Sequence, residues 1–239
     1  MLHFHSFISL WMFSTVLLYG GVLVTSAQSF IFNVPSTDTQ PVNTIYIEAD
    51  LFAHFASYPN GGFQKFGPLT VYGLRKNVEI GVNFYYDREE NKRALELQPN
   101  IKWKAYNGDK KGVAVSVGTI AFIPLNKAAG TRPTAMVYAN GSKTIQSAKG
   151  MRLTGGIYQW INTEQNFGTK TGVMLGLEQP ITKKMTLLVD WFSGKNRLGY
   201  SSVGFGYHES KSQYFGIVYS FGNSGRGNNY FTAFYGFTF

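Results

Sequence analysis

The chain contains no cysteine, and only 15% of its 239 residues are charged. Without cysteine it has no disulfide, no thiolate nucleophile and no cysteine-based metal site. Beyond the N-terminus, no stretch stays apolar for the roughly 18 residues that a transmembrane helix needs. The mean hydropathy of -0.11 agrees with this. A bundle of membrane-spanning helices is therefore excluded.

Aromatic residues and glycine are abundant instead. The 20 Phe, 15 Tyr and 27 Gly indicate strands and turns, because aromatic side chains fit pleated surfaces and glycine supplies turns. The formal net charge is +9, but Lys and Arg are spread from Lys65 to Arg226 and form no basic tract. We therefore expect a solvated positive surface and no nucleic-acid partner.

The N-terminus has the pattern of an export signal. Residues 7–24 form an apolar run, and Thr25 and Ala27 stand at the −3 and −1 positions of a possible cleavage site. This pattern predicts a secretory signal peptide over residues 1–27. The run is long and no Lys or Arg precedes it, so an uncleaved anchor helix stays an alternative. We expect residues 28–42 to form a periplasmic extension.

From residue 43 on, turn signals separate short segments whose length suits tilted strands that cross a bilayer. Asn-Gly pairs at 107–108 and 140–141 predict tight hairpin turns. If both termini are periplasmic, turns after even-numbered strands should be short, and residues 140–150 break this rule. Period two predicts twelve strands, over residues 43–54, 64–74, 78–87, 93–106, 111–123, 132–140, 151–162, 170–179, 184–193, 198–207, 212–221 and 229–239.

The faces of these segments separate two fold classes. In residues 78–87, Val78, Ile80 and Val82 lie on one face and Glu79 and Asn83 on the other. A soluble β-sandwich also alternates in this way. However, the apolar faces are long, and Tyr and Trp gather near strand ends, where the aromatic girdles of a membrane barrel lie. The sequence therefore favours an all-β fold, a transmembrane antiparallel up-and-down β-barrel over residues 43–239, with a soluble secreted β protein as the alternative.

The last nine residues, FTAFYGFTF, end on Phe239 and carry alternating apolar side chains. This ending resembles the C-terminal strand of Gram-negative outer-membrane β-barrel proteins, and residues 187–207 and 215–224 resemble the closing hairpins of porin-like barrels. Phe234 stands where that family usually has glycine. The resemblance implies residence in the outer membrane, contact with its lipid and recognition by the barrel-assembly machinery. The assembly signal that it implies consists of Thr232, Tyr235, Phe237 and Phe239.

The polar faces are expected to point into the lumen. A twelve-stranded lumen is wider than an eight-stranded one, which side chains fill, and much narrower than that of a sixteen-stranded porin. We expect a narrow porin-like channel for small polar solutes or ions, with a closed structural or interaction barrel without transport as the alternative. The candidate pore-lining residues are Glu48, Asp50, Glu79, Asn83, Glu96, Gln98, Lys102, Lys104, Arg152, Glu178 and Asp190.

No residue pattern indicates a catalytic centre. His54 and Ser57 are close in sequence, but nothing marks a third member of a triad or an oxyanion hole. No His, Asp and Glu set has metal-ligand spacing, and no phosphate-binding loop is visible. We therefore expect no enzymatic activity, no metal and no cofactor.

Overall fold

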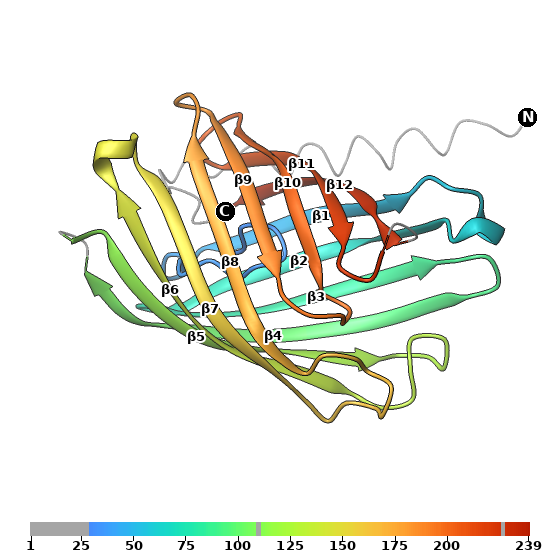
Figure 1. Ribbon diagram of the computed structural model, residues 1–239. Coiled ribbons are helices and arrows are strands. Elements are labelled where there is room, and N and C mark those ends of the chain that lie inside the picture. The colour runs from blue at the N-terminus through green and yellow to red at the C-terminus, as the bar shows by residue number, and fades with distance from the viewer. Residues whose placement is uncertain (1–28, 109–110, 226–227) are drawn as a thin grey trace, which may run out of the picture.

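The computed structural model describes residues 29–108, 111–225 and 228–239, so the predicted signal peptide at 1–27 lies outside the described residues. The described chain forms a closed barrel in which each strand pairs antiparallel with its sequence neighbours and β12 pairs with β1 (Figure 1). The predicted up-and-down barrel of twelve strands is confirmed. The strands are β1 (Ile45–His54), β2 (Phe63–Arg75), β3 (Val78–Arg88), β4 (Arg93–Gly108), β5 (Val113–Pro124), β6 (Thr134–Ile145), β7 (Met151–Ile161), β8 (Thr171–Pro180), β9 (Met185–Phe192), β10 (Tyr200–His208), β11 (Gln213–Gly222) and β12 (Tyr230–Thr238).

The described ranges contain two short 3-10 turns, η2 (Tyr58–Asn60) and η4 (Gln146–Ala148). Within those ranges, no helix has the length and apolar character to cross a membrane.

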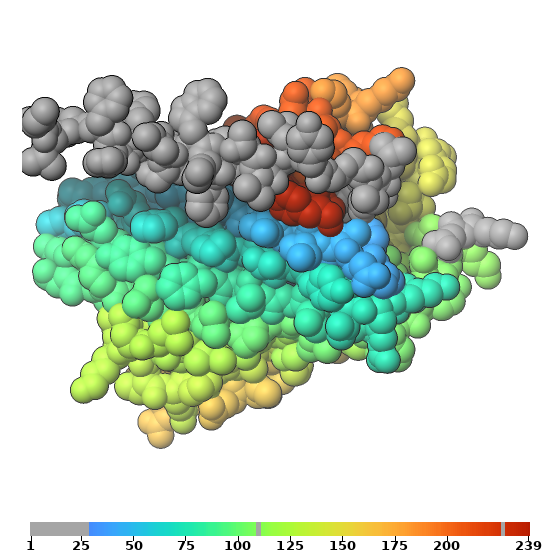
Figure 2. All heavy atoms as spheres, turned by 180° about the vertical axis from the view of Figure 1, so that it is seen from behind, coloured from blue at the N-terminus to red at the C-terminus, as the bar shows by residue number. Residues whose placement is uncertain are grey.

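The outward side chains form an apolar surface. Ile47, Ile157, Phe205 and Ile217 are between 41% and 63% exposed, whereas the side chains between them along each strand face inward. Figure 2 shows this outer surface over the first strands as a continuous layer of side chains, coloured blue to green. A protein with its core between two sheets would bury these residues. The exposed apolar surface is that of a barrel surrounded by lipid.

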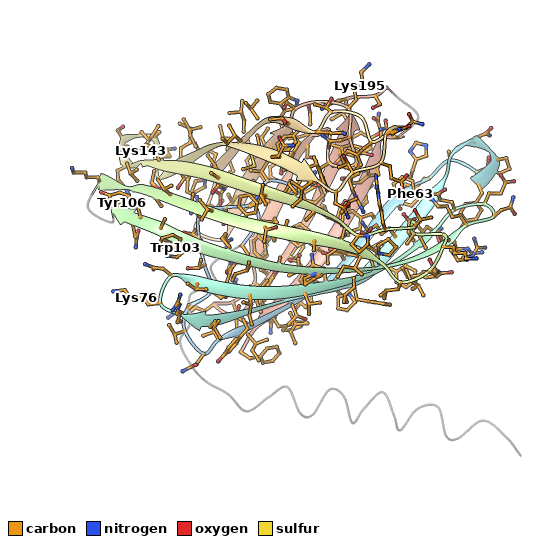
Figure 3. All side chains as sticks on the ribbon, turned by 90° about the horizontal axis from the view of Figure 1, so that it is seen from below. Phe63, Lys76, Trp103, Tyr106, Lys143 and Lys195 are labelled. Carbon is orange, nitrogen blue, oxygen red and sulfur yellow. The ribbon has the colours of Figure 1, made fainter. Side chains whose placement is uncertain are left out.

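The two ends of the barrel differ. We call the end where β1 begins and β12 finishes the terminus end, and the other the loop end. The terminus end carries short turns such as residues 76–77 and 181–184, and the loop end carries longer segments such as residues 125–133 and 162–170. In Figure 3, Lys76 and Lys143 mark the terminus end, and Phe63 and Lys195 mark the loop end.

Neither Asn-Gly pair forms the turn that was predicted for it. Asn107 and Gly108 are the last two residues of β4, where they pair with β5. Asn140 and Gly141 lie inside β6, which continues to Ile145, so the turn that follows is as short as its place requires. Asn140 points inward and hydrogen bonds to Ser116 and to the Pro35 carbonyl oxygen. These tertiary contacts outweigh the local preference of an Asn-Gly pair for a turn.

Inward aromatic side chains lie over glycines of neighbouring strands. A Cβ atom added at Gly206 would stand 1.8 Å from the Tyr214 hydroxyl oxygen, and one at Gly236 would stand 2.1 Å from the Tyr46 hydroxyl oxygen. Glycine is required at these positions because the ring of the neighbouring residue occupies the space of a side chain. Large rings thereby fill part of the lumen along β1 and β10–β12.

Candidate functional site

The structure places the residues that were expected to form a periplasmic extension inside the barrel. The Ile31 amide donates to the Val34 carbonyl oxygen at 2.8 Å, and the Ser36 amide donates to the Ser29 carbonyl oxygen at 3.0 Å, so this part forms a hairpin. Ile31, Val34 and Ser36 are fully buried. The blue trace in Figure 1 shows the segment among the strands. We call residues 29–40 the inner segment.

The inner segment packs against one side of the lumen. Ile31 and Val34 belong to a buried cluster formed by inward residues of β5–β9, β11 and β12, among them Trp160, Met174 and Leu188. We call these inward residues the apolar wall. Burying Ile31 and Val34 there removes their side chains from water, which stabilises each by about 1.5–3 kcal/mol relative to exposure. The alternation of polar and apolar residues predicted a polar lumen, whereas this side of the lumen is apolar.

An ion pair of the barrel holds the base of the inner segment. Lys102 on β4 lies 2.9 Å from Glu79 on β3, and both side chains are almost completely buried. The same Glu79 carboxylate accepts hydrogen bonds from the Ser29 hydroxyl at 3.0 Å and the Gln40 amide at 2.8 Å. The Lys102 ammonium also donates to the Ser29 carbonyl oxygen at 2.8 Å. The ion pair of Glu79 and Lys102 therefore binds both ends of the inner segment.

A carboxylate of β9 binds the tip of the hairpin. One oxygen of Asp190 accepts hydrogen bonds from the backbone amides of Asn33 at 2.5 Å and Val34 at 2.9 Å. The Asn33 side chain donates to the Ser202 hydroxyl at 3.0 Å. Asp190 thus satisfies backbone donors at a turn that would otherwise be buried without partners.

Two cations of the strands, Lys104 of β4 and Arg152 of β7, bind Asp38 of the inner segment. Lys104 lies 3.1 Å from one oxygen of Asp38, and Arg152 contacts the other oxygen. Arg152 also forms a bidentate pair with Glu178, at 2.5 and 2.7 Å. Burial alone would raise the pKa of Asp38, but Arg152 and Lys104 outweigh that effect and hold the pKa below its usual 3.8. Asp38 therefore stays charged at neutral pH.

A cavity of about 350 Å³ lies between the inner segment and β1–β4. Phe63 and Tyr230 line it toward the loop end. Its deeper part holds Glu48, which accepts a hydrogen bond from the Tyr46 hydroxyl, and Asp50, which accepts one from the Tyr85 hydroxyl at 2.6 Å. We call the inward side chains of β1–β4 the polar wall.

Arg197, which the sequence analysis did not single out, lies at the mouth of the cavity. It sits in the segment between β9 and β10 and binds Glu96 through two nitrogen atoms, at 2.9 and 2.6 Å. Its guanidinium carbon is 4.2 Å from the centre of the Phe122 ring. Its partner is 101 residues away, so sequence carried no local signal for this pair.

The candidate pore-lining residues all point inward, but they serve different parts of the lumen. One group binds the inner segment directly or, in the case of Glu178, binds a residue that does so, and it comprises Glu79, Lys102, Lys104, Arg152, Glu178 and Asp190. A second group, Glu48, Asp50, Asn83 and Gln98, lines the cavity, and Glu96 pairs with Arg197. Among the described residues, no three His, Cys, Asp or Glu side chains form a set that could hold a metal ion.

The residues of the expected assembly signal lie on both faces of β12. Thr232 is buried on the inner face, while Tyr235 and Phe239 are exposed outward, at 40% and 46%. Phe237 lies opposite Ile47 of β1. The outward residues therefore end the apolar surface at the strand that closes the barrel.

No protein-family model matches the sequence, and no curated protein matches it. The prediction of no enzymatic activity needs correction, because solved structures similar to this chain include outer membrane phospholipase A from Escherichia coli. It has a TM-score of 0.47 and 10% identity, over 84% of this chain and 93% of that chain. Absence of a recognisable catalytic pattern was therefore the wrong ground for excluding activity. The likeness assigns no reaction to this chain. The His54 ring stacks on Phe63, and the Ser57 hydroxyl accepts a hydrogen bond from the Asn60 side chain.

Two solved structures are similar with higher TM-scores. A KdgM porin has a TM-score of 0.59 and 8% identity, over 82% of this chain and 99% of that chain. A COG4313 outer membrane channel from Pseudomonas putida F1 has a TM-score of 0.55 and 11% identity, over 85% of this chain and 98% of that chain. At these identities the likeness shows the fold. With its closed twelve-stranded barrel and apolar outer surface, the chain has the fold of a porin-like outer-membrane β-barrel.

Proposed function

We propose that the protein is a narrow channel for small polar solutes or ions, and that its inner segment closes it in the present conformation. The observation that carries this proposal is the cavity of about 350 Å³, which the inner segment leaves unfilled along the polar wall. A barrel with only a structural role has no need of a lumen lined by carboxylates, amides and a lysine. The path that we propose runs along β1–β4.

The contacts of the inner segment are compatible with its displacement. Glu79, Lys102, Asp190 and Arg152 bind it by hydrogen bonds and ion pairs, and each of these groups belongs to a strand. Water can replace the inner segment at all of these groups if the segment leaves. These inward polar groups of the barrel therefore suit a hydrated lumen as well as a filled one.

A sealed barrel is the second candidate. The complete burial of Ile31 and Val34 against the apolar wall favours it, because moving these side chains into water is unfavourable. The two candidates differ in one measurable property, the conductance of the purified protein.

A disulfide lock tests the proposal. The Thr37 hydroxyl of the inner segment lies 2.6 Å from the Ser142 hydroxyl of β6, and the natural chain has no cysteine that could compete. We expect the variant Thr37→Cys/Ser142→Cys to be silent in planar bilayers when oxidised and to give ohmic steps again after reduction. A variant without residues 29–40 should give larger steps than the unaltered chain.

The single variant Thr37→Cys is the matched control, since its conductance should not respond to reductant. A heat-modifiable band on electrophoresis establishes that each variant is folded. If the folded unaltered chain, the reduced pair and the deletion variant are all silent, the channel proposal is refuted and the sealed barrel is favoured.

A further inference from the structure

We propose that the cavity beside the inner segment binds a small organic amine, whose ammonium group is held by Glu48 and Asp50. The inference deepens the proposed function and rests on it for the route by which the ligand arrives from the loop end. It concerns the chemistry of the cavity and does not require that the bound amine be transported.

The charges around the cavity are not balanced. Glu48, Asp50 and Asp87 line it together with Lys65 and Arg197, and Arg197 is already bound to Glu96. In the described part of the chain, neither Glu48 nor Asp50 forms an ion pair, and their two carboxyl groups share a hydrogen bond. Two close carboxyl groups without a counter-ion hold a proton between them away from bulk water, because both cannot ionise there. A cation in the cavity would take the place of this proton and compensate both carboxylates.

Among the described residues that line the cavity, the buried side-chain atoms without a partner are acceptors. The side-chain oxygen of Asn83, a residue only 5% exposed, has no hydrogen-bond donor among the described residues, and neither has Asp87 Oδ1. The amide orientation of Asn83 follows from its nitrogen, which donates to Gln98 at 3.3 Å, while Gln98 donates to Glu96 at 2.7 Å. A ligand that satisfies these acceptors must bring N–H or O–H donors. An ammonium group brings three.

The aromatic residues of the cavity suit an organic cation. The Lys65 ammonium nitrogen lies 4.3 Å from the centre of the Tyr85 ring and 5.3 Å from that of Phe52. The chain's own ammonium group thus shows that these ring faces accept a cation. Phe52 also contacts Tyr230, with ring centres 5.9 Å apart, so the methylene groups of an amine would lie against apolar surface.

Other ligand classes fit less well. An anion would meet the carboxylates of Glu48, Asp50 and Asp87 with one free ammonium group, Lys65, to offset them. A metal ion would need a set of ligands that the described residues do not provide. A neutral diol brings donors but leaves the two carboxylates uncompensated. An amine supplies both the positive charge that the carboxylates lack and the N–H donors that the unpartnered acceptors lack.

Calorimetric titration of the full chain in detergent tests the inference, with butane-1,4-diamine as the probe and butane-1,4-diol and succinate as controls of the same length. We expect the diamine to bind and the two controls to bind at least roughly tenfold more weakly, as loss of a charged hydrogen bond predicts. Asp50→Asn should weaken diamine binding by roughly tenfold. Glu89→Gln, in a segment of the loop end, should leave it unchanged.

Lys65→Met gives the sharpest result. It removes the cation that competes for the same rings and carboxylates, so diamine binding should become several-fold tighter. Damage to the fold can only weaken binding, so tightening identifies the site. Equal binding of the diol, or weaker binding by a Lys65→Met variant that still gives the heat-modifiable band of a folded barrel, would overturn the inference. Conductance is measured separately, so the two proposals can fail independently. A chain that conducts but binds no diamine refutes the amine site and agrees with the channel proposal. A chain that binds the diamine but does not conduct refutes the channel proposal and agrees with the amine site.

Discussion

Replacing Lys102 by methionine should release the inner segment. Lys102 and Glu79 belong to neighbouring strands and form an ion pair at 2.9 Å, with 3% and 2% of their side chains exposed. The inner segment covers this pair and adds hydrogen bonds through Ser29 and Gln40. In Lys102→Met, the Glu79 carboxylate keeps its two neutral donors but loses its counter-ion.

The cost falls mainly on the closed state. Removing one partner of a buried ion pair is unfavourable by about 3–5 kcal/mol, because the other charge stays buried without compensation. When the inner segment leaves, water hydrates Glu79 and most of this cost disappears. Taking about 3 kcal/mol as the difference, the equilibrium between closed and open barrels should shift by roughly 100-fold toward the open form.

Two measurements follow this shift. Planar-bilayer recordings should show a larger fraction of time in the open state, and hydrogen exchange with mass spectrometry should show faster exchange of the amides in residues 29–40. The double variant Glu79→Gln/Lys102→Met removes both charges and should return most of the protection.

The matched control is Lys92→Met. Lys92 pairs with Glu89 at 3.5 Å, but their side chains are 51% and 45% exposed, so the pair contributes about 0–1 kcal/mol. Unchanged exchange and unchanged open time in Lys102→Met would show that the ion pair does not hold the inner segment, and the reasoning would fail.

Four further predictions concern the barrel itself. Ile157, 63% exposed on β7, faces lipid, so Ile157→Lys should lower the free energy of unfolding in vesicles by about 2–4 kcal/mol, while Ile157→Leu should change it little. Gly206→Ala would place its Cβ 1.8 Å from the Tyr214 hydroxyl and should destabilise by about 1–3 kcal/mol in a urea titration. Gly141→Ala, whose Cβ would have its nearest neighbour at 3.6 Å, should change stability by less than about 1 kcal/mol. A larger loss would indicate that Gly141 adopts the turn conformation that the sequence predicted. Removal of Phe239 should reduce the yield of heat-modifiable barrel in the outer membrane, and an unchanged yield would contradict its role in the assembly signal.

Strand positions and faces could be predicted because both depend on local pattern. Val82 and Asn83 are neighbours in β3, and the structure places Val82 outward at 41% exposure and Asn83 inward at 5%. Period two is enough to separate them, since a lipid-facing strand must keep one face apolar throughout. Local pattern failed at Asn140, where contacts with Ser116 and Pro35 keep the strand extended.

The inner segment could not be predicted from period or propensity, because it is short and has a mixed sequence. The strand register contains the missing signal. Glu79 and Lys102 are cross-strand neighbours and compensate each other, as Arg152 and Glu178 do. Lys104 and Asp190, by contrast, have Ser116, Gly176 and Ser202 as neighbours. An inward charge without an opposite charge beside it requires a partner from elsewhere, and the inner segment supplies Asp38 to Lys104 and two backbone amides to Asp190.

The same comparison applied to β1 leads to the cavity. Glu48 has Leu69 and Gly236 as its cross-strand neighbours, and Asp50 has Gly67 and Phe234. These two carboxylates have no opposite charge among their cross-strand neighbours, as is also the case for Lys104 and Asp190, and the inner segment forms no ion pair with them. Lys65 acts on Asp50 from beside the cavity but forms an ion pair with neither carboxylate, so a cation from solution is the further source of compensation. The diamine titration measures whether a small organic amine is that cation.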